Sequence, residues 1–177
     1  MKRENTTTTT ASQDALAITN HARLMVALKT LCDKSYYYAI GCNNNGFFVS
    51  ERDSFGVAKE CIKYNFFENK DSANAVINQI NDCINRTVDE RPPLDFSSID
   101  LDAEIEVDLD NLFVIAEYAS CVESAAEHDF SQEKALNAIA KGVAWFTREE
   151  AEEALAVVRE ILAEHHDPSW LLRRYNV

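Results

Sequence analysis

The chain has few of the residues that interrupt regular structure, with only four glycines and three prolines among 177 residues. Loops that surround a phosphate group with backbone amides need several glycines, so the sequence gives no support to a phosphate-binding loop. No apolar run reaches the roughly eighteen residues that a membrane-spanning helix requires. We therefore expect no membrane association, and the N-terminus has no apolar segment typical of a signal peptide.

Patterns typical of enzymes and metal sites are also missing. The five cysteines, at positions 32, 42, 61, 83 and 121, include no Cys-x-x-Cys pair, which favours reduced thiols in a cytoplasmic protein. Histidines 21, 128, 165 and 166 form no i, i+4 pair that could chelate a metal from one helix face. No hydrolase nucleophile motif is present. We expect no catalytic residue, no metal ligand and no cofactor.

Positive charge is missing from one long stretch. From Pro92 to Glu133 inclusive there is no Lys or Arg, whereas Asp and Glu together number twelve. The formal net charge of the whole chain is −13. Such a charge disfavours direct binding to nucleic acid or to an anionic membrane, and it favours basic proteins or cations as partners.

Within this stretch, residues 99–110 alternate strictly between apolar and acidic side chains. A helix turns about 100° per residue and would mix the two kinds around its circumference. A strand sends successive side chains to opposite faces and would separate them. The pattern therefore predicts a strand over residues 99–109, with the apolar side chains facing the core. The outward side chains would be Asp100, Asp102, Glu104, Glu106, Asp108 and Asp110.

Electrostatic repulsion makes such a row costly. Side chains on one face of a strand lie about 6.6 Å apart, and two like charges at that distance in water repel by about 0.6 kcal/mol. Five neighbouring pairs give about 3 kcal/mol, compared with a typical domain stability of about 5–15 kcal/mol. A cationic partner would offset this repulsion.

The rest of the chain predicts a single α+β domain over residues 14–177, preceded by a disordered, threonine-rich leader over residues 1–13. A small, mostly antiparallel sheet would contain a hairpin within residues 35–50, turning at Asn45-Gly46, together with the 99–109 strand. Five or six helices would cover one face of this sheet. Apolar spacing and capping residues predict helices over residues 14–33, 54–64, 69–86, 111–127, 131–142 and 147–165.

In its charge pattern over residues 95–133, the chain resembles the acidic DNA-mimic inhibitors of phages and plasmids, among them anti-restriction and anti-CRISPR proteins. These inhibitors share no common fold, so the resemblance implies nothing about architecture. It implies a non-enzymatic inhibitor whose carboxylates occupy the nucleic-acid-binding site of a basic partner protein. The partner-binding residues would be the six outward carboxylates of residues 100–110, extended by Glu117 and Glu123.

Three alternatives remain open from the sequence. The acidic face can be a solvated surface, or the protein can be a structural homo-oligomer such as a homodimer. A calcium-binding module is the third, because residues 106–117 place acids at loop positions 1, 3, 5 and 12 of the EF-hand pattern. That segment departs from the pattern at Asn111, where the sharp turn of an EF-hand requires glycine.

Overall fold

The structure is a computed structural model that describes residues 7–89, 97 and 104–176. The described helices are α1 (Thr7–Lys34), α2 (Phe55–Cys61), α3 (Lys70–Asp89), α4 (Gln132–Ala140), α5 (Arg148–His165) and α6 (Ser169–Tyr175). The strands are β1 (Tyr37–Asn43), β2 (Gly46–Arg52), β3 (Phe113–Ile115), β4 (Val122–Ser124) and β5 (Ala144–Trp145). The predicted α+β class is confirmed, but two small antiparallel sheets, β1-β2 and β4-β3-β5, replace the single expected sheet.

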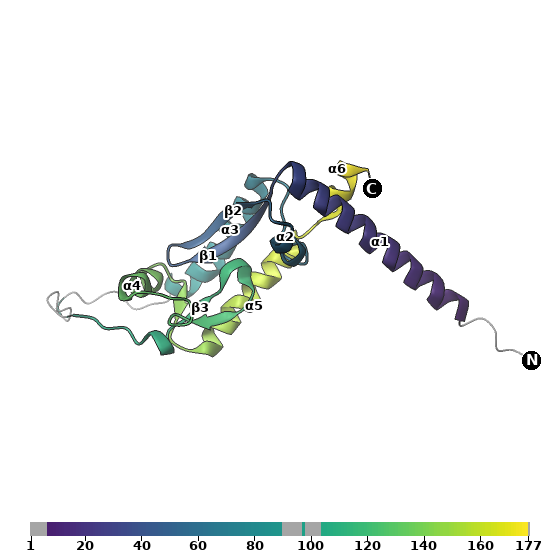
Figure 1. Cartoon of the computed structure of the whole chain (residues 1–177). Helices are drawn as coiled ribbons and strands as arrows, with labels where there is room; N and C mark the ends of the chain where they lie inside the picture. Colours follow the sequence, from purple (N-terminus) through teal and green to yellow (C-terminus); the bar gives the residue numbers. More distant parts are fainter. Residues whose placement is uncertain (1–6, 90–96, 98–103, 177) are drawn as a thin grey trace, which may run out of the picture.

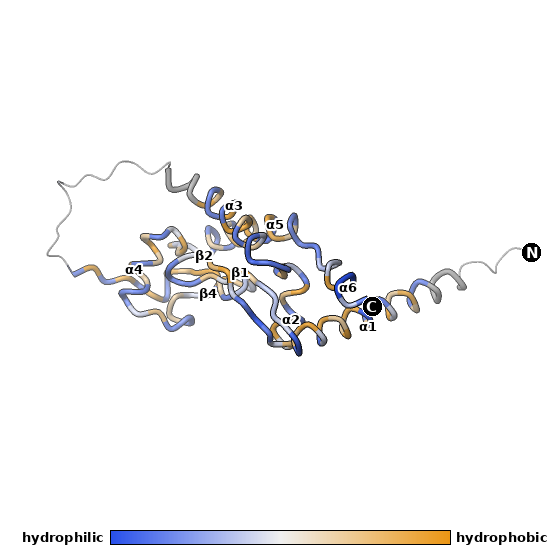
Figure 2. The backbone as a smooth tube through the Cα atoms, turned by 90° about the horizontal axis from the view of Figure 1, so that it is seen from above, coloured by the Kyte–Doolittle hydropathy of each residue, from blue (hydrophilic) through white to orange (hydrophobic). Residues whose placement is uncertain are grey.

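Helix α1 is longer than the sequence analysis predicts. It begins at Thr7, so residues 7–13 of the expected disordered leader are helical, and residues 1–6 lie outside the described part. Its C-terminal half buries Ala27, Leu28 and Leu31 against α2 and α6, whereas its N-terminal half projects away from the body (Figures 1 and 2). No described helix is long and apolar enough to cross a membrane.

The hairpin β1-β2 confirms the prediction for residues 35–50. Asn43 lies opposite Gly46, and the Asn45 amide donates a hydrogen bond to Asn43 Oδ1 at 2.8 Å. Gly46 has a φ of +111°, which non-glycine residues rarely adopt. The turn therefore needs positive φ at Gly46 only, and not at Asn45 as well.

The predicted helix over residues 111–127 is wrong, because this segment forms β3, a turn and β4. Tyr118 and Ala119 have φ values of 61° and 57° within the turn, and a right-handed helix cannot contain them. Leu112 to Ile115 is a continuous apolar run, which is typical of a strand buried on both faces. Helical spacing of the apolar residues here was coincidental.

The sheet β4-β3-β5 lies between α4 on one face and α3 and α5 on the other. Phe113 and Ile115 face the core that α3 and α5 cover, whereas Leu112 and Val114 face the core under α4. Strand β5 follows the same alternation, with Trp145 on the α5 side and Ala144 on the α4 side. The helices therefore cover both faces of this sheet, where the sequence predicts cover on one face.

The predicted starts of α3, α4 and α5 are confirmed by their capping bonds. Asn69 accepts from the Ser72 amide at 2.9 Å, and Ser131 accepts from the Lys134 amide at 3.3 Å. Thr147 accepts from the Glu150 amide at 3.2 Å. Each side chain satisfies a backbone donor that the first turn of its helix leaves free.

Helix α6 docks through an aromatic stack. The rings of Tyr37 and Phe66 lie 4.8 Å apart, and those of Phe66 and Trp170 lie 5.4 Å apart. Leu171 is fully buried in the same cluster. The apolar residues after Pro168 therefore close the core beside the C-terminal half of α1.

Candidate partner-binding groove

The strand predicted over residues 99–109 is not found in its described part. Residues 104–108 have no regular secondary structure, and residues 109–111 form a short 3-10 turn. Asp100 and Asp102 lie outside the described residues. A strand needs a neighbouring strand to bond its backbone groups, and residues 104–108 pair with none among the described residues.

The side chain of Gln132 makes the hydrogen bonds to Val107 that a neighbouring strand would otherwise make. The Val107 amide donates to Gln132 Oε1 at 2.7 Å, and Gln132 Nε2 donates to the Val107 carbonyl at 2.8 Å. Both backbone groups of Val107 are thereby satisfied, as they would be in a sheet. These two hydrogen bonds attach residues 104–108, called the acidic segment from here on, to the start of α4.

The extended segment ends at Asp108. Its carboxylate accepts from the Asp110 amide at 3.1 Å and from Asn111 Nδ2 at 2.8 Å, and so caps the 3-10 turn. The Asn111 side-chain bond is the main cause that lowers the pKa of Asp108. Asp108 is therefore a structural cap as well as an exposed carboxylate.

Residues 106–110 alternate between exposed acidic and half-buried apolar side chains, although they do not form a strand. Val107 and Leu109 are half-buried against the core under α4, while Glu106, Asp108 and Asp110 are exposed. Glu104 is exposed as well. Ile105 departs from the prediction because 67% of its surface is exposed, although the pattern predicts that it faces the core.

The two predicted outlying carboxylates lie on the sheet β4-β3-β5 and its turn, and both are paired. Glu117 is exposed and accepts from Arg52 Nη2 at 2.9 Å. Glu123 is half-buried on β4, and its carboxylate lies 2.8 Å from His128 Nδ1. The predicted α-helix is wrong for both residues, because Glu117 begins a short 3-10 turn and Glu123 lies on β4.

A groove lies beside the acidic segment, and apolar side chains from three elements converge on it. It has a volume of about 550 Å³. Ile105 comes from the acidic segment, Leu136 from α4, and Phe146 from the residue after β5. Their exposed fractions are 67%, 38% and 64%, and Val107 and Ile139 also line the groove. The polar lining residues are Glu106, Asp108 and Asn111.

Sequence reasoning missed the apolar part of this groove. The helix predicted over residues 131–142 has both Ala135 and Leu136 facing inward. The structure buries Ala135 together with Ala138, but it leaves Leu136 exposed. Phe146 carried a usable signal, because it directly follows Trp145 in an extended segment. Adjacent residues there point to opposite sides, so only one of the two aromatic rings can enter the core covered by α5.

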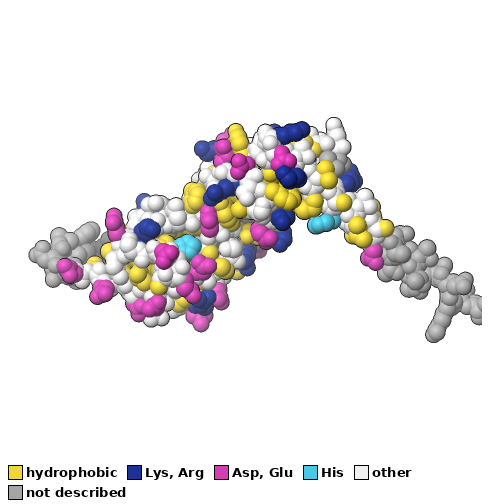
Figure 3. All heavy atoms as spheres, viewed as in Figure 1, with side chains coloured by type: hydrophobic (Ala, Val, Ile, Leu, Met, Phe, Trp, Pro, Cys, Tyr) yellow, Lys and Arg dark blue, Asp and Glu magenta, His cyan; other side chains and the backbone are white. Residues whose placement is uncertain are grey.

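Acidic side chains surround the end of the molecule that carries α4 and residues 104–111 (Figure 3). An apolar groove with a carboxylate rim suits a partner that is basic and amphipathic. The apolar side chains of the groove would contact the apolar face of the partner, and the carboxylates would contact its basic side chains. Free carboxylates on one side also disfavour an anionic ligand.

The described residues do not form the calcium site that the sequence left open. They contain no group of three or more His, Cys, Asp or Glu side chains placed to hold a metal ion. Residues 113–115 of the EF-hand-like pattern form β3, so this segment cannot be a calcium loop. Burial raises the pKa of the Cys42 and Cys61 thiols to about 12, which leaves both protonated at neutral pH.

Comparisons with known proteins place this chain in no family: no family model, no curated protein and no solved structure matches it.

Proposed function

We propose that this protein is a non-enzymatic inhibitor that binds a basic, nucleic-acid-binding protein. The binding site would be the groove beside the acidic segment, which we call the acidic groove. The observation that carries the proposal is the convergence of Ile105, Leu136 and Phe146 on one groove whose rim is carboxylate. Large apolar side chains left exposed together are typical of protein-binding surfaces. The surrounding negative charge selects for a basic partner and speeds its association.

The exposed carboxylates of residues 104–110 would imitate the phosphates of DNA, although they do not stand on a strand. Glu104, Glu106 and Asp108 on residues 104–108, and Asp110 in the 3-10 turn that follows, expose their carboxylates to solvent. A nucleic-acid-binding site meets phosphates with Lys and Arg. The apolar groove adds contacts that a phosphate row does not offer. The partner would therefore lose its access to nucleic acid while gaining apolar contacts with Leu136 and Phe146.

The test is capture of partners from a bacterial lysate, with the retained proteins identified by mass spectrometry. The variant Glu104→Gln/Glu106→Gln/Asp110→Asn removes three rim charges and leaves the Asp108 cap in place. The matched control, Glu51→Gln/Glu68→Gln/Glu160→Gln, removes three exposed charges elsewhere, none of which has an ion pair in the described residues.

We expect a nucleic-acid-binding protein that the wild type and the control retain, that the rim variant releases, and that added duplex DNA displaces. Equal retention by the rim variant, or retention that duplex DNA does not affect, would rule out the mimic.

A second candidate function is homo-oligomerisation through α1. Every described side chain from Gln13 to Arg23 is exposed, including Leu16 and Ile18, and Val26 is exposed on the next turn. Isolated helices of this length are marginal in water, so the projecting half needs contacts from another molecule to be stable. Ile18 and Val26 lie on the same side of α1, and light scattering would report a dimer that Ile18→Ser/Val26→Ser converts to a monomer. A monomeric wild type would exclude this function.

A further inference from the structure

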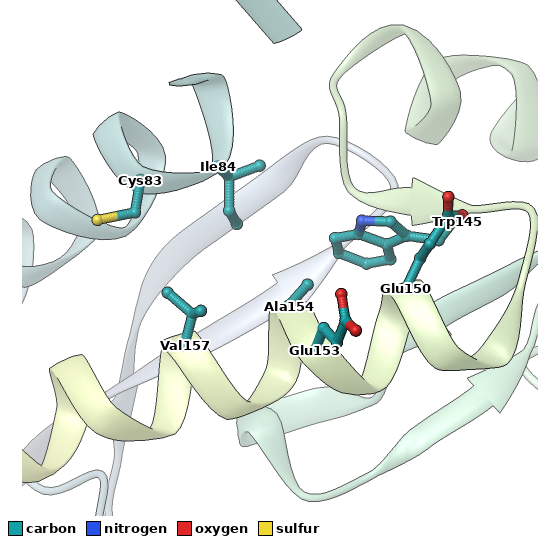
Figure 4. A pocket seen from close by; sticks show the side chains of 7 residues that line it. All are labelled: Cys83, Ile84, Trp145, Glu150, Glu153, Ala154 and Val157. Carbon is teal, nitrogen blue, oxygen red and sulfur yellow. The ribbon is translucent and has the colours of Figure 1, made fainter. Parts of the chain in front are cut away.

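A second pocket lies on the opposite side of the sheet β4-β3-β5 from the acidic groove. It has a volume of about 290 Å³ and is lined by residues from the second half of α3, from residues 150–157 of α5, and from β5. Figure 4 shows the indole of Trp145 above Ala154, with Ile84 and Val157 forming an apolar side. Pockets for small ligands span about 300–1,000 Å³, so this one suits a small group.

Two carboxylates join the indole. Glu150 and Glu153 stand on α5 three residues apart, so they share one side of the helix, and both lie beside the Trp145 ring in Figure 4. Both are exposed, and neither forms an ion pair within the described residues.

Arg148, a cation near Glu150 on α5, is directed elsewhere. Arg148 donates to the Val122 carbonyl at 3.2 Å, and its guanidinium lies 5.1 Å from the centre of the Phe113 ring. It also faces Glu152 at 4.0 Å. Among the lining residues whose side chains the structure describes, two are negatively charged and none is positively charged.

The helix dipole explains only part of this arrangement. Acidic residues are favoured in the first turn of a helix, which accounts for Glu149 and Glu150. The effect fades within that turn, and Glu153 lies beyond it. The dipole therefore does not account for the place of Glu153 beside Trp145.

We infer that this pocket binds an organic cation, either a guanidinium or an alkylammonium group on an aliphatic stem. The face of a tryptophan ring attracts such cations, and the two carboxylates supply the opposite charge. Ile84, Ala154 and Val157 offer apolar surface to the stem, as lysine and arginine stems use in proteins. A neutral apolar ligand would cover the two carboxylates without pairing them, which is unfavourable.

A metal ion fits the pocket less well. The Cys83 sulfur points away from the indole and the carboxylates in Figure 4, so it does not complete a set of ligands with them. Two carboxylates on one exposed helix face leave most of the coordination shell of a hard cation to water.

The source of the cation is a basic side chain of another protein or a free polyamine, and the experiment separates the two. The full chain, labelled with ¹⁵N, gives two indole resonances, because it has only Trp145 and Trp170. The variant Trp145→Phe assigns them. The probes are Nα-acetyl-arginine amide, spermidine, and the neutral isostere Nα-acetyl-citrulline amide.

We expect one cationic probe to shift the Trp145 indole resonance saturably while the Trp170 resonance, in the buried aromatic stack, stays in place. Tighter binding of the arginine derivative would identify a protein side chain, and tighter binding of spermidine would identify a polyamine. Glu153→Gln should weaken the binding at least tenfold, whereas the exposed control Glu160→Gln should leave it unchanged.

Three results would overturn the inference: no saturable shift with either cation, an equal shift with the citrulline derivative, or unchanged affinity in Glu153→Gln. Far-ultraviolet circular dichroism of each variant checks that α5 is intact. None of these readouts depends on the acidic groove, so the inference and the proposed function can fail separately.

Discussion

The side-chain amide of Gln132 bonds both backbone groups of Val107, at 2.7 and 2.8 Å, and thereby acts as a one-residue strand partner. Asn65 does the same for Ile40 on β1, where both bonds are 2.8 Å. In both places an amide side chain satisfies an extended backbone that has no strand on that side. The acidic segment thus owes its position to a residue of α4.

Replacing Gln132 should release this segment. Gln132→Ala removes two partly buried hydrogen bonds, each worth about 0.5–1.5 kcal/mol, so we expect a loss of about 1–3 kcal/mol. Hydrogen exchange should show faster exchange of the Val107 amide. The control Glu133→Ala changes the exposed neighbouring residue and should leave that amide protected. Unchanged protection in Gln132→Ala would show that other contacts hold the segment.

The fold needs Leu112 but does not need Phe146. Leu112 is fully buried under α4, so Leu112→Ala should destabilise the protein by about 2–5 kcal/mol. Phe146 is 64% exposed, and Phe146→Ala should change the stability by less than about 0.5 kcal/mol. Chemical denaturation measures both values. A large loss of stability in Phe146→Ala would mean that Phe146 contributes to the core, and its exposure would then not indicate a binding site.

Glu127 should make stability depend on pH in the acid range. The Ser124 amide donates to its carboxylate at 2.9 Å, which lowers the pKa of Glu127 from its ordinary value of 4.5. When the pKa of a carboxyl is lower in the folded state, ionisation of that group stabilises the folded protein at pH values above the unfolded-state pKa. This stabilisation is lost as the pH falls through the folded-state pKa. Glu127→Gln should therefore be less stable than the wild type at pH 7, with the difference shrinking below about pH 4.5. A difference that stays constant with pH would contradict the bond.

The thiols should differ sharply in reactivity. Cys121 is exposed, whereas Cys42 and Cys61 are buried and have pKa values raised to about 12. Alkylation requires an accessible thiolate, so iodoacetamide should label Cys121 first in the native protein. Peptide mass spectrometry over a time course measures the order. Labelling of Cys42 or Cys61 at the rate of Cys121 would mean that their core is open.

Features that depend on neighbouring residues could be predicted from the sequence. The hairpin follows from the glycine at position 46, and the starts of α3, α4 and α5 follow from Asn69, Ser131 and Thr147. Each is decided by side-chain and backbone bonds within a few residues.

Features that depend on distant partners could not be predicted. Strand β3 exists because Val114 pairs with Glu123 on β4 and with Ala144 on β5. The spacing of apolar residues within 111–127 does not indicate these pairings. The alternating run gave the directions of Val107 to Asp110, but no local pattern states that a glutamine from α4 replaces a strand. The groove joins three segments, so it was visible only after folding.

The most direct test of the account measures the affinity of the captured basic partner for the wild type as the salt concentration rises. We expect the affinity to fall with salt, and to fall less steeply for Glu104→Gln/Glu106→Gln/Asp110→Asn, because fewer charges then contribute to binding. The variant Phe146→Ser should bind more weakly with the salt dependence unchanged. Identical affinity and salt dependence in all three proteins would contradict the acidic groove as the binding site.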